Sequence, residues 1–584
     1  MARSFLSRRL HRADSTEAPD RPEAAEAPDA QAPAPQTPAP LPVPTAGEPL
    51  EIPPLSVYDL LFSDLADDDL DRVALVDGAS GDETSYRQLV AQIDALAGSL
   101  AARGLAVGDR VGILCPNIPA FATVFHGVLR AGGTATTVNS LYTTDEIANQ
   151  LRSAEAGWLF TVSPLYPQAR AAAEAVGIPA ERLVVIDGAD GHPSLRDLLF
   201  DRAAPPTVRF DPATHLAVLP YSSGTTGHPK GVMLTHRNLV ANVLQCERAI
   251  TLERDDRVLA VLPFFHIYGM SVLLDFALLK RAALVTMPKF DLAEFLRTVS
   301  EHRCTWVFIA PPIAVALAKH PLVDDYDLSS VKVVFSGAAP LDGTLAGAVA
   351  ERIGCEVCQG YGMTETSPVT HVIPTGEPGI DRSSIGRAVP GTECRLVDVE
   401  TGLDVGLPED GQSARGELLV RGPQVMPGYL HDEEATRRTL DADGWLHTGD
   451  IATVDATGVF TIVDRLKELI KYKGYQVAPA VLEAVLLAHP QIADAAVVGV
   501  PDDDGQEVPK AFVVRTAQAD PGQGEGPGEE AQLGEEAVIA WVQERVAPHE
   551  KVRLVEFIDV VPKSASGKIL RKDLRAKTGR HAAA

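Results

Sequence analysis

The stretch Y-S-S-G-T-T-G-H-P-K-G, from Tyr221 to Gly231, decides the fold of this 584-residue chain. It places four hydroxyl side chains, two glycines and a lysine in one short loop: Ser222, Ser223, Gly224, Thr225, Thr226, Gly227 and Lys230. Glycines let backbone N–H groups approach a ligand closely, and the hydroxyls and the lysine add further donors. The composition therefore favours an anion, most often phosphate. A plain surface turn uses the same residue types, but rarely in this combination.

The residues around the loop predict a strand before it and a helix after it. The apolar run 216–219 is typical of a buried strand, and Thr235 can cap a helix that runs through Leu244. A strand, a glycine-rich loop and a helix are a common arrangement for phosphate sites. The P-loop spacing is excluded, because Pro229 precedes Lys230 and Gly231 follows it.

Composition and charge narrow the classes of function. The formal net charge of −27 argues against broad nucleic-acid binding and against an anionic membrane surface. The six cysteines are scattered and form no disulfide framework, which predicts a reducing, cytoplasmic setting. The longest apolar run, 306–318, is too short for a membrane span and contains two prolines.

The pattern along the chain predicts an α/β fold between two low-complexity segments. Residues 1–50 are rich in Ala and Pro and are predicted to be a disordered extension. Helical spacing at 86–103, a strand pattern at 110–115 and helical spacing at 120–130 begin an α/β alternation. A second disordered insertion is predicted near 518–533.

Further motifs with chemical potential follow the opening loop. In Q-G-Y-G-M-T-E (359–365), two glycines flank Tyr361, whose ring can lie flat against a nucleobase, and Glu365 can hold Mg²⁺. In G-W-L-H-T-G-D, the final Asp450 is suited to a ribose diol. The other stretches are S-G-A-A-P (336–340), D-R-L-K-E-L-I-K-Y-K-G-Y-Q (464–476) and P-K-S-A-S-G-K-I-L-R-K (562–572).

In this order, the motifs resemble those of the adenylate-forming superfamily, and most closely those of 4-coumarate–CoA ligases and related acyl-CoA synthetases. The resemblance covers about residues 55–577. It implies a large N-terminal domain of layered α/β subdomains (51–463) and a small, mobile α+β C-terminal domain (464–584), with the hinge at Asp464. It also implies a two-step reaction, in which ATP converts a carboxylate into an acyl-adenylate with loss of pyrophosphate. The thiol of coenzyme A then displaces AMP.

The resemblance also implies roles for single residues. The ATP or AMP site would use the loop residues of the opening stretch together with Gln359, Gly360, Tyr361, Thr364, Asp450, Arg465 and Gln476. Thr225 and Glu365 would hold Mg²⁺, and Lys473 and Gly474 would meet CoA. Lys568 would contact the carboxylate and the α-phosphate in the first step. The alternative for Lys568 is a solvated lysine in a basic tail, in which Arg571, Lys572, Arg575 and Lys577 follow. Lys467 and Lys471 would share a face if their segment were helical.

The acid substrate is predicted from the motif around His266. His266 and Tyr268 would line the acyl pocket, with walls formed by Ala338, Gly360 and Val369. His266 stands where amino-acid-activating relatives have an aspartate, which argues against an amino-acid substrate. The alternative is that His266 shields the site without touching the acid. Gly269 would widen or lengthen the pocket, so a fatty acid rivals a cinnamate-type acid.

Three functions stay open on the sequence. The first is a carboxylate–CoA ligase that uses ATP, Mg²⁺ and CoA, as a monomer or homodimer. The second is a stand-alone adenylating enzyme that loads a carrier protein. The third is a non-catalytic adenylate-binding protein, against which the retained Lys230, Glu365, Asp450 and Lys568 argue.

Overall fold

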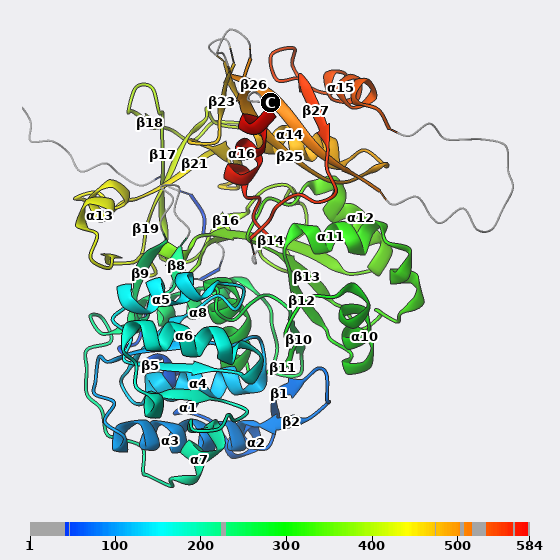
Figure 1. Cartoon of the computed structure of the whole chain (residues 1–584). Coiled ribbons are helices and arrows are strands. Elements are labelled where there is room, and N and C mark those ends of the chain that lie inside the picture. Colours follow the sequence, from blue (N-terminus) through cyan, green and yellow to red (C-terminus); the bar gives the residue numbers. More distant parts are fainter. Residues whose placement is uncertain are drawn as a thin grey trace, which may run out of the picture. The chain divides into compact units, whose positions relative to one another are not determined.

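The structure, a computed structural model, describes residues 41, 43–45, 47–48, 50–222, 229–472, 475–502, 507–516, 533–564 and 567–581 (Figure 1). Most of the predicted N-terminal extension and nearly all of the predicted insertion near 518–533 lie outside these residues. So do Ser223, Gly224, Thr225, Thr226 and Gly227 of the phosphate loop and Lys473 and Gly474 of the expected CoA loop. The fold is mixed α/β, with a large N-terminal domain and a small C-terminal domain.

A nine-stranded sheet with a parallel centre carries most of the predicted motifs. Its order is β16-β15-β14-β13-β12-β10-β11-β1-β2, and the pairs from β14 to β1 are parallel. All residues of β12 and β13 are buried, and all of them except Ser336 are apolar, as expected for strands covered on both faces. The strands are β1 (Val73–Asp77), β2 (Glu83–Ser85), β10 (Arg257–Ala260), β11 (Ala283–Thr286), β12 (Trp306–Ile309), β13 (Val333–Ser336), β14 (Glu356–Gly362), β15 (Val369–Val372) and β16 (Arg387–Ala388).

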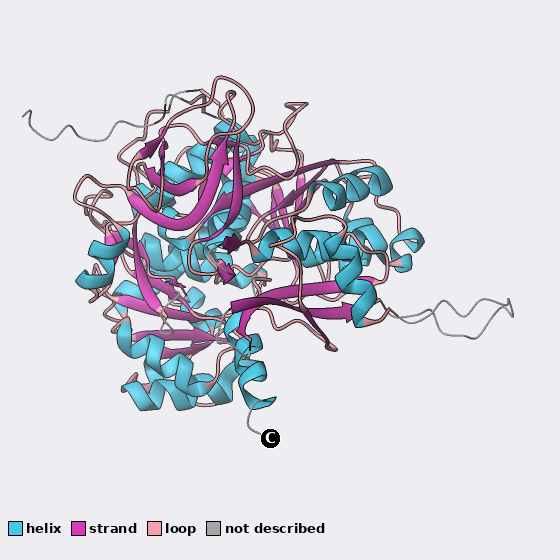
Figure 2. Ribbon diagram, turned by 90° about the horizontal axis from the view of Figure 1, so that it is seen from above, coloured by secondary structure: helices cyan, strands magenta, loops and turns pink. Residues whose placement is uncertain are grey.

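A second sheet holds the two ends of the opening loop. Its order is β20-β9-β7-β4-β3-β5-β6, and β8 pairs with β9, so that Ser222 lies opposite Lys230. Figure 2 shows the helices of the protein in cyan and its strands in magenta. The strands are β3 (Arg110–Leu114), β4 (Thr134–Thr137), β5 (Trp158–Thr161), β6 (Leu183–Val185), β7 (Leu216–Val218), β8 (Tyr221–Ser222), β9 (Lys230–Thr235) and β20 (Gly428–Tyr429).

A five-stranded antiparallel sheet follows, in the order β18-β17-β19-β21-β22. Its last two strands place Asp450 directly opposite Arg465. The predicted hinge residue Asp464 lies inside β22, opposite Ile451. The strands are β17 (Glu393–Val397), β18 (Asp404–Val405), β19 (Gly416–Arg421), β21 (Leu446–Val454) and β22 (Phe460–Arg465).

The small C-terminal domain has its own sheet and its own apolar core. The long strands β25 and β26 pair antiparallel, and β27 joins β26 in parallel. Helices α14 and α15 contribute Leu482, Leu486, Val538 and Val542 to this core. The elements are β23 (Ile470–Tyr472), β24 (Tyr475–Val477), α14 (Pro479–Leu487), β25 (Ile492–Pro501), β26 (Glu507–Arg515), α15 (Glu535–Gln543), β27 (Leu554–Phe557) and α16 (Arg571–His581). The domain boundary at residues 463/464 stays a prediction.

Local sequence signals account for the helix starts. Thr235 accepts a hydrogen bond from the backbone N–H of Asn238, and the Asn238 side chain accepts one from the Thr235 N–H, which confirms the predicted cap. Ser85, Thr143 and Ser194 begin helices in the same way. The remaining α-helices are α1 (Val57–Phe62), α2 (Asp67–Leu70), α3 (Tyr86–Ala102), α4 (Pro119–Arg130), α5 (Thr144–Ser153), α6 (Tyr166–Val176), α7 (Leu195–Phe200), α8 (His236–Ala249), α9 (Phe276–Leu279), α10 (Leu292–His302), α11 (Pro311–Lys319), α12 (Gly343–Ile353) and α13 (Glu433–Thr439).

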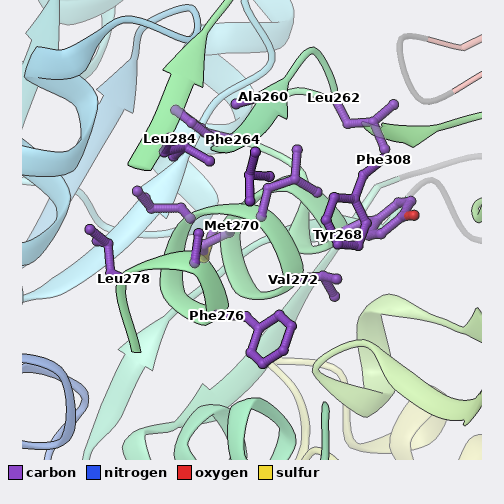
Figure 3. Packing of buried hydrophobic residues seen from close by; sticks show 14 of the residues in the cluster. Ala260, Leu262, Phe264, Tyr268, Met270, Val272, Phe276, Leu278, Leu284 and Phe308 are labelled. Carbon is purple, nitrogen blue, oxygen red and sulfur yellow. The ribbon is translucent and has the colours of Figure 1, made fainter. Parts of the chain in front are cut away.

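One element of the core is a π-helix, η3 (Tyr268–Asp275), which begins two residues after His266. All eight of its residues are buried, and its apolar side chains pack among those of the nine-stranded sheet (Figure 3). The ring of Tyr268 meets that of Phe308 edge-on, with 6.5 Å between the centroids. Short 3₁₀ segments are η1 (Ser163–Leu165), η2 (Ala180–Arg182), η4 (Pro321–Asp325) and η5 (Thr364–Thr366).

The folded chain begins before residue 51, where the sequence placed the end of the extension. The N–H of Leu41 donates to the carbonyl of Cys394 at 2.8 Å. Leu41 and Val43 are partly buried against the five-stranded sheet, and Pro44 lies against Gly458. The expectation of disorder up to residue 50 is therefore wrong for its described end, where apolar side chains find a partner surface.

In the parts of the chain that the structure describes, no helix combines the length and the apolar character needed to cross a membrane.

Candidate active site

The carboxyl ends of the parallel strands bring the motifs to one edge of the nine-stranded sheet. Ile309 and Ser336 end β12 and β13, and they are in register with each other and with Gln359 in the middle of β14. Each of these three residues precedes residues of a motif from the sequence analysis, or residues that contact such a motif. In open α/β sheets this edge is where ligands bind. The order of the parallel strands therefore brings S-G-A-A-P, Q-G-Y-G-M-T-E and the His266 segment to the same edge of the sheet.

Glu365 organises the described part of the phosphate loop. The carboxylate is 6% exposed, and its Oε1 accepts hydrogen bonds from the Ser222 hydroxyl (3.0 Å) and the Tyr429 hydroxyl (2.8 Å). The Lys230 ammonium lies 4.9 Å from the centroid of the Tyr429 ring. Ser222, Lys230 and Glu365 were predicted, and the structure brings them together, whereas Tyr429 was missed.

The same carboxylate fits a hard cation. Both hydrogen bonds given above fall on Oε1, and oxygen ligands are what Mg²⁺ prefers. Within the described ranges, no group of three or more His, Cys, Asp or Glu residues forms a metal cage. A Mg²⁺ ion at Glu365 would thus be held mainly by the phosphates of a nucleotide, as is usual for this metal.

Asp450 forms a second polar centre with two predicted partners. The Tyr361 hydroxyl donates to Asp450 Oδ2 at 2.6 Å, and Arg465 Nε lies 3.1 Å from Oδ1. The Asp450 side chain is 6% exposed, so these two donors offset the cost of burying its charge. Burial raises the pKa of Tyr361, so its hydroxyl stays protonated and donates. The stacking of the Tyr361 ring on a nucleobase stays a prediction.

Gln359 braces the site through its side chain. Its amide oxygen accepts from the N–H of Leu341 (3.1 Å), and its amide nitrogen donates to the carbonyl of Arg382 (2.6 Å). The residue is 3% exposed. Gln359 thus ties together two loops that border the motifs. Gly360 pairs with Val372, and Thr364 begins η5. The contacts of Gln359, Gly360 and Thr364 with a nucleotide stay predictions.

Lys568 lies on a tight turn that faces the large domain. The carbonyl of Lys568 accepts from the Ser564 N–H at 2.8 Å, and the Lys568 N–H donates to the Ser564 hydroxyl at 3.2 Å. A Cβ on Gly567, whose φ is +83°, would lie 3.0 Å from the Cβ of Ala310. The turn therefore packs against the start of α11, at the carboxyl end of β12.

The charges that act on Lys568 include those of Arg465, Glu468 and Asp450. Burial, with Arg465 as the second cause, lowers the pKa of Lys568 to about 8, whereas Glu468 and Asp450 oppose this shift. Burial lowers the pKa of His266 to about 4, with Lys568 as the second cause. Near neutral pH the lysine is mostly charged and the histidine is neutral. By geometry, the Lys568 turn lies against Ala310, which follows β12, and Tyr361 of β14 in the same sheet bonds Asp450.

The predicted acyl pocket is built around the Tyr268 ring. A Cβ on Gly337 would lie 2.7 Å from the Cε1 of Tyr268, so only glycine leaves room for the ring. The next residue, Ala338, is exposed and has a φ of +71°, a conformation that costs a non-glycine residue free energy. Val369 is buried, and the Asn242 amide bonds both its N–H (3.0 Å) and its carbonyl (2.7 Å). That these residues line an acyl pocket stays a prediction.

The expected effect of Gly269 is wrong. A Cβ at this position would lie 2.1 Å from the carbonyl oxygen of Pro263. Glycine is therefore required by a close approach of two backbone segments at the start of η3. It does not open space for a longer acid, so the sequence argument for a fatty acid loses its support.

Two further expectations concern the segment after β22. Lys467 and Lys471 do not share a helical face, because residues 466–468 form a turn and Lys471 lies in β23. Lys473 and Gly474 fall outside the described residues, as does the side chain of Gln476, whose backbone pairs with Lys471.

Comparisons with known proteins agree with this geometry. The family model for AMP-binding enzymes matches residues 62–430, and that for the AMP-binding enzyme C-terminal domain matches residues 481–568. 4-Coumarate–CoA ligase 5 of Oryza sativa subsp. japonica is 41% identical over 535 residues, which cover 90% of this chain and 94% of the relative.

Solved structures of this kind share the fold. The anthranilate CoA ligase AuaEII in complex with anthranoyl-AMP gives a TM-score of 0.80 at 27% identity, covering 91% of this chain and 98% of that one. ATP-bound MatB from Rhodopseudomonas palustris gives 0.78 at 29% identity, covering 89% and 98%. Because the family model matches residues 62–430 and a relative is 41% identical over 90% of the chain, this chain belongs to the AMP-binding enzyme family.

Proposed function

We propose that this protein is an ATP-dependent carboxylate–CoA ligase, which makes an acyl-adenylate and then a CoA thioester. The observation that carries the proposal is that the Lys568 turn packs against Ala310 at the edge of the nine-stranded sheet where Tyr361, the partner of the Asp450–Arg465 pair, also lies. Relatives at 41% identity are named 4-coumarate–CoA ligases, which supports CoA as the acceptor.

The first half-reaction needs charge stabilisation and alignment rather than a protein nucleophile. In the proposed mechanism, Lys568 binds the substrate carboxylate and the α-phosphate, where negative charge builds up as the carboxylate attacks. Asp450 accepts hydrogen bonds from the ribose hydroxyls, while Tyr361 and Arg465 hold its carboxylate in place. Pyrophosphate leaves along the loop that starts at Ser222 and ends at Lys230.

Mg²⁺ at Glu365 would supply positive charge to the phosphates of ATP. Ser222 and Tyr429 orient the Glu365 carboxylate for this task by donating to the same oxygen. The neutral His266 would close the site beside the acid and exclude water, which protects an adenylate from hydrolysis.

The second half-reaction would follow a rotation of the small domain about Asp464. Lys568 would then leave the site, and the loop with Lys473 and Gly474 would meet CoA. Asp464 is the second-last residue of β22, after which the chain continues into the elements of the small domain, and this supports the assignment. Alternation of two faces is a known way to run two reactions in one site.

Among acids, we favour an aromatic acid of the 4-coumarate or cinnamate type. The named relatives include 4-coumarate–CoA ligases and an anthranilate CoA ligase. The pocket candidates include the Tyr268 ring, whose hydroxyl lies 3.4 Å from the carbonyl of Phe335. All six cysteines are free thiols, which supports a reducing, cytoplasmic setting. A monomer or a homodimer is expected.

The deciding experiment is product analysis by mass spectrometry. Purified full-length protein is given ATP, MgCl₂, CoA and a pool of 4-coumarate, cinnamate, benzoate and saturated fatty acids from hexanoate to octadecanoate. A hydroxycinnamoyl-CoA product is expected. A fatty acyl-CoA would keep the reaction and overturn the acid. An acyl-adenylate with no thioester would favour loading of a carrier protein, and no turnover at all would favour an adenylate-binding protein.

The matched control is the Lys568→Ala variant. The rate of acid-dependent pyrophosphate release should fall by about two to three orders of magnitude in this variant. ATP should still bind, because Lys568 is proposed to stabilise the transition state. If release stays at the wild-type rate, the proposed role of Lys568 is wrong.

A further inference from the structure

Arg571 follows the catalytic lysine by three residues and is not part of a solvated basic tail. Its side chain is 11% exposed. Nη1 donates to Glu468 Oε2 at 2.6 Å, Nη2 donates to both oxygens of Glu483 at 2.8 and 2.7 Å, and Nε donates to the carbonyl of Val497 at 3.2 Å. Such charge-assisted hydrogen bonds are roughly twice as strong as those between neutral groups.

The groups that Arg571 joins come from three different elements. Glu468 follows the hinge residue Asp464 by four positions, in the turn after β22. Glu483 lies on α14 and Val497 on β25, and the Val497 N–H also donates to Glu483 at 2.8 Å. Arg571 itself is the first residue of α16, directly behind the turn that carries Lys568. One guanidinium therefore links the hinge segment, the domain core and the catalytic turn.

The other end of that turn is held in a similar way. The ammonium of Lys563 lies 2.6 Å from Asp494 on β25, and both side chains are largely buried, at 18% and 25% exposure. The N–H of Leu570 donates to the carbonyl of Pro562 at 2.9 Å, which closes the turn. Each end of the turn is thus fixed to β25, but only the Arg571 end also reaches the hinge segment through Glu468.

Arg571, Glu468 and Glu483, called the clamp from here on, lie near a further carboxylate, that of Asp464, so that carboxylates outnumber the cation. Asp464 and Glu483 are 3% and 8% exposed, and burial raises the pKa of each to about 7, while Arg571 opposes both shifts. The electrostatic effects of Arg571 and Glu468 extend to Lys568, where they have opposite signs. Loss of Arg571 would therefore leave buried carboxylates without their shared partner.

We propose that Arg571 is a positioning residue for the acid-activation half-reaction, because its bonds to Glu468 and Glu483 fix the Lys568 turn to the segment that follows the hinge. When the small domain rotates about Asp464, Lys568 then moves with the hinge segment as one rigid body. This inference rests on the proposed function. It adds a role for a residue that never contacts the substrate.

The test separates the two half-reactions. Arg571→Lys keeps the charge but replaces the three bonding nitrogens of the guanidinium with a single ammonium nitrogen, and Glu468→Gln weakens the hinge link while keeping the bonds to Glu483. Exchange of pyrophosphate into ATP with 4-coumarate measures the first step. Thioester formation from synthetic 4-coumaroyl-AMP and CoA measures the second. The control is Lys572→Gln, the neighbouring exposed cation.

Both clamp variants should lose about 30- to 100-fold in the first step, since a displacement of about 1 Å costs that order of rate. The second step should stay within about threefold of the wild-type rate, and Lys572→Gln should match the wild type in both. Equal losses in the two steps would indicate a merely structural residue and overturn the proposal, as would no loss in either.

A second readout does not depend on turnover. Hydrogen exchange at the amides of Lys568 and Leu570, both hydrogen-bonded in the turn, should be faster in Arg571→Lys than in the wild type and the control. Unchanged hydrogen exchange at these amides would overturn the proposed role of the clamp, whichever carboxylic acid is the substrate. A wild-type protein that made no adenylate but showed the exchange change would instead refute the proposed function.

Discussion

Burial sets the charge that the Lys568 side chain carries. Desolvation lowers the pKa of Lys568 to about 8, with Arg465 adding to the effect. The group is then mostly protonated near neutral pH and loses its charge under mildly alkaline conditions. A lysine with this lowered pKa is still mostly charged at physiological pH, but its pKa lies closer to that pH than the pKa of an exposed lysine does.

This shift makes the first half-reaction sensitive to pH. The protonated form is the active one, so kcat/KM for ATP in pyrophosphate exchange should be full well below pH 8 and fall as the pH rises through about 8. Thioester formation from a synthetic acyl-adenylate, which does not use Lys568, serves as the control. A first step whose rate is flat up to pH 10 would contradict the assignment.

The Tyr361 hydroxyl is predicted to hold Asp450 for the ribose. Tyr361→Phe removes the 2.6 Å hydrogen bond and leaves the Arg465 contact, so ATP binding should weaken by about 3- to 10-fold. Titration calorimetry with ATP measures this. Tyr58→Phe is the matched control, because Tyr58 donates to Asp94 at 3.1 Å elsewhere in the fold. Equal affinities in the two variants would refute the role.

Among the secondary-structure elements, the π-helix η3 connects the His266 segment to the core. Its eight residues are buried, and its first residue is Tyr268. The close approach of Gly269 to the Pro263 carbonyl fixes how η3 leaves the preceding loop. The element is therefore determined by packing on both sides rather than by the space inside a pocket.

The prediction for this element is a loss of stability without a change of substrate. In Gly269→Ala, the new methyl group would lie 2.1 Å from a backbone oxygen, so unfolding should become easier by about 1–3 kcal/mol. Denaturant unfolding measures the shift, and relative kcat/KM values for cinnamate and octanoate should not change. Gly406→Ala is the control, since a Cβ there meets nothing within 4 Å. A clear shift towards longer acids would restore the discarded interpretation of Gly269.

Between the two domains, Lys319 forms a direct link. It ends α11 of the large domain, and its ammonium donates to the carbonyls of Leu487 (2.9 Å) and Ile492 (3.1 Å) in the small domain. These bonds exist in the arrangement in which the Lys568 turn also packs against Ala310 of the large domain. They must break if the small domain rotates.

Lys319→Met should therefore disfavour this arrangement. We expect acid activation to slow by about 3- to 10-fold, because two charge-assisted bonds at a partly exposed site contribute modestly. The thioester step should be unchanged or faster. The measurement is the rate of each step in Lys319→Met, compared with the rate in Lys289→Met, a control at an exposed position. Equal rates in both variants would show that Lys319 does not contribute to the balance.

Local signals made part of this protein predictable. The helix predicted at 86–103 is α3 (Tyr86–Ala102), the strand predicted at 110–115 is β3 (Arg110–Leu114), and the predicted Thr235 cap is present. Apolar periodicity and capping depend on residues within a few positions of one another, so one sequence is sufficient to recognise them. The order of the motifs likewise identified the family.

The sequence alone was thus sufficient for the α/β class, the family and most candidate residues, because these follow from neighbouring residues and from the spacing of motifs. It could not show that Tyr429 bonds Glu365, that Arg571 is clamped by Glu468 and Glu483, or that Gly269 meets a backbone carbonyl. These contacts join residues from separate elements. They exist only once strand order and domain packing bring the elements together, and no local pattern encodes that arrangement.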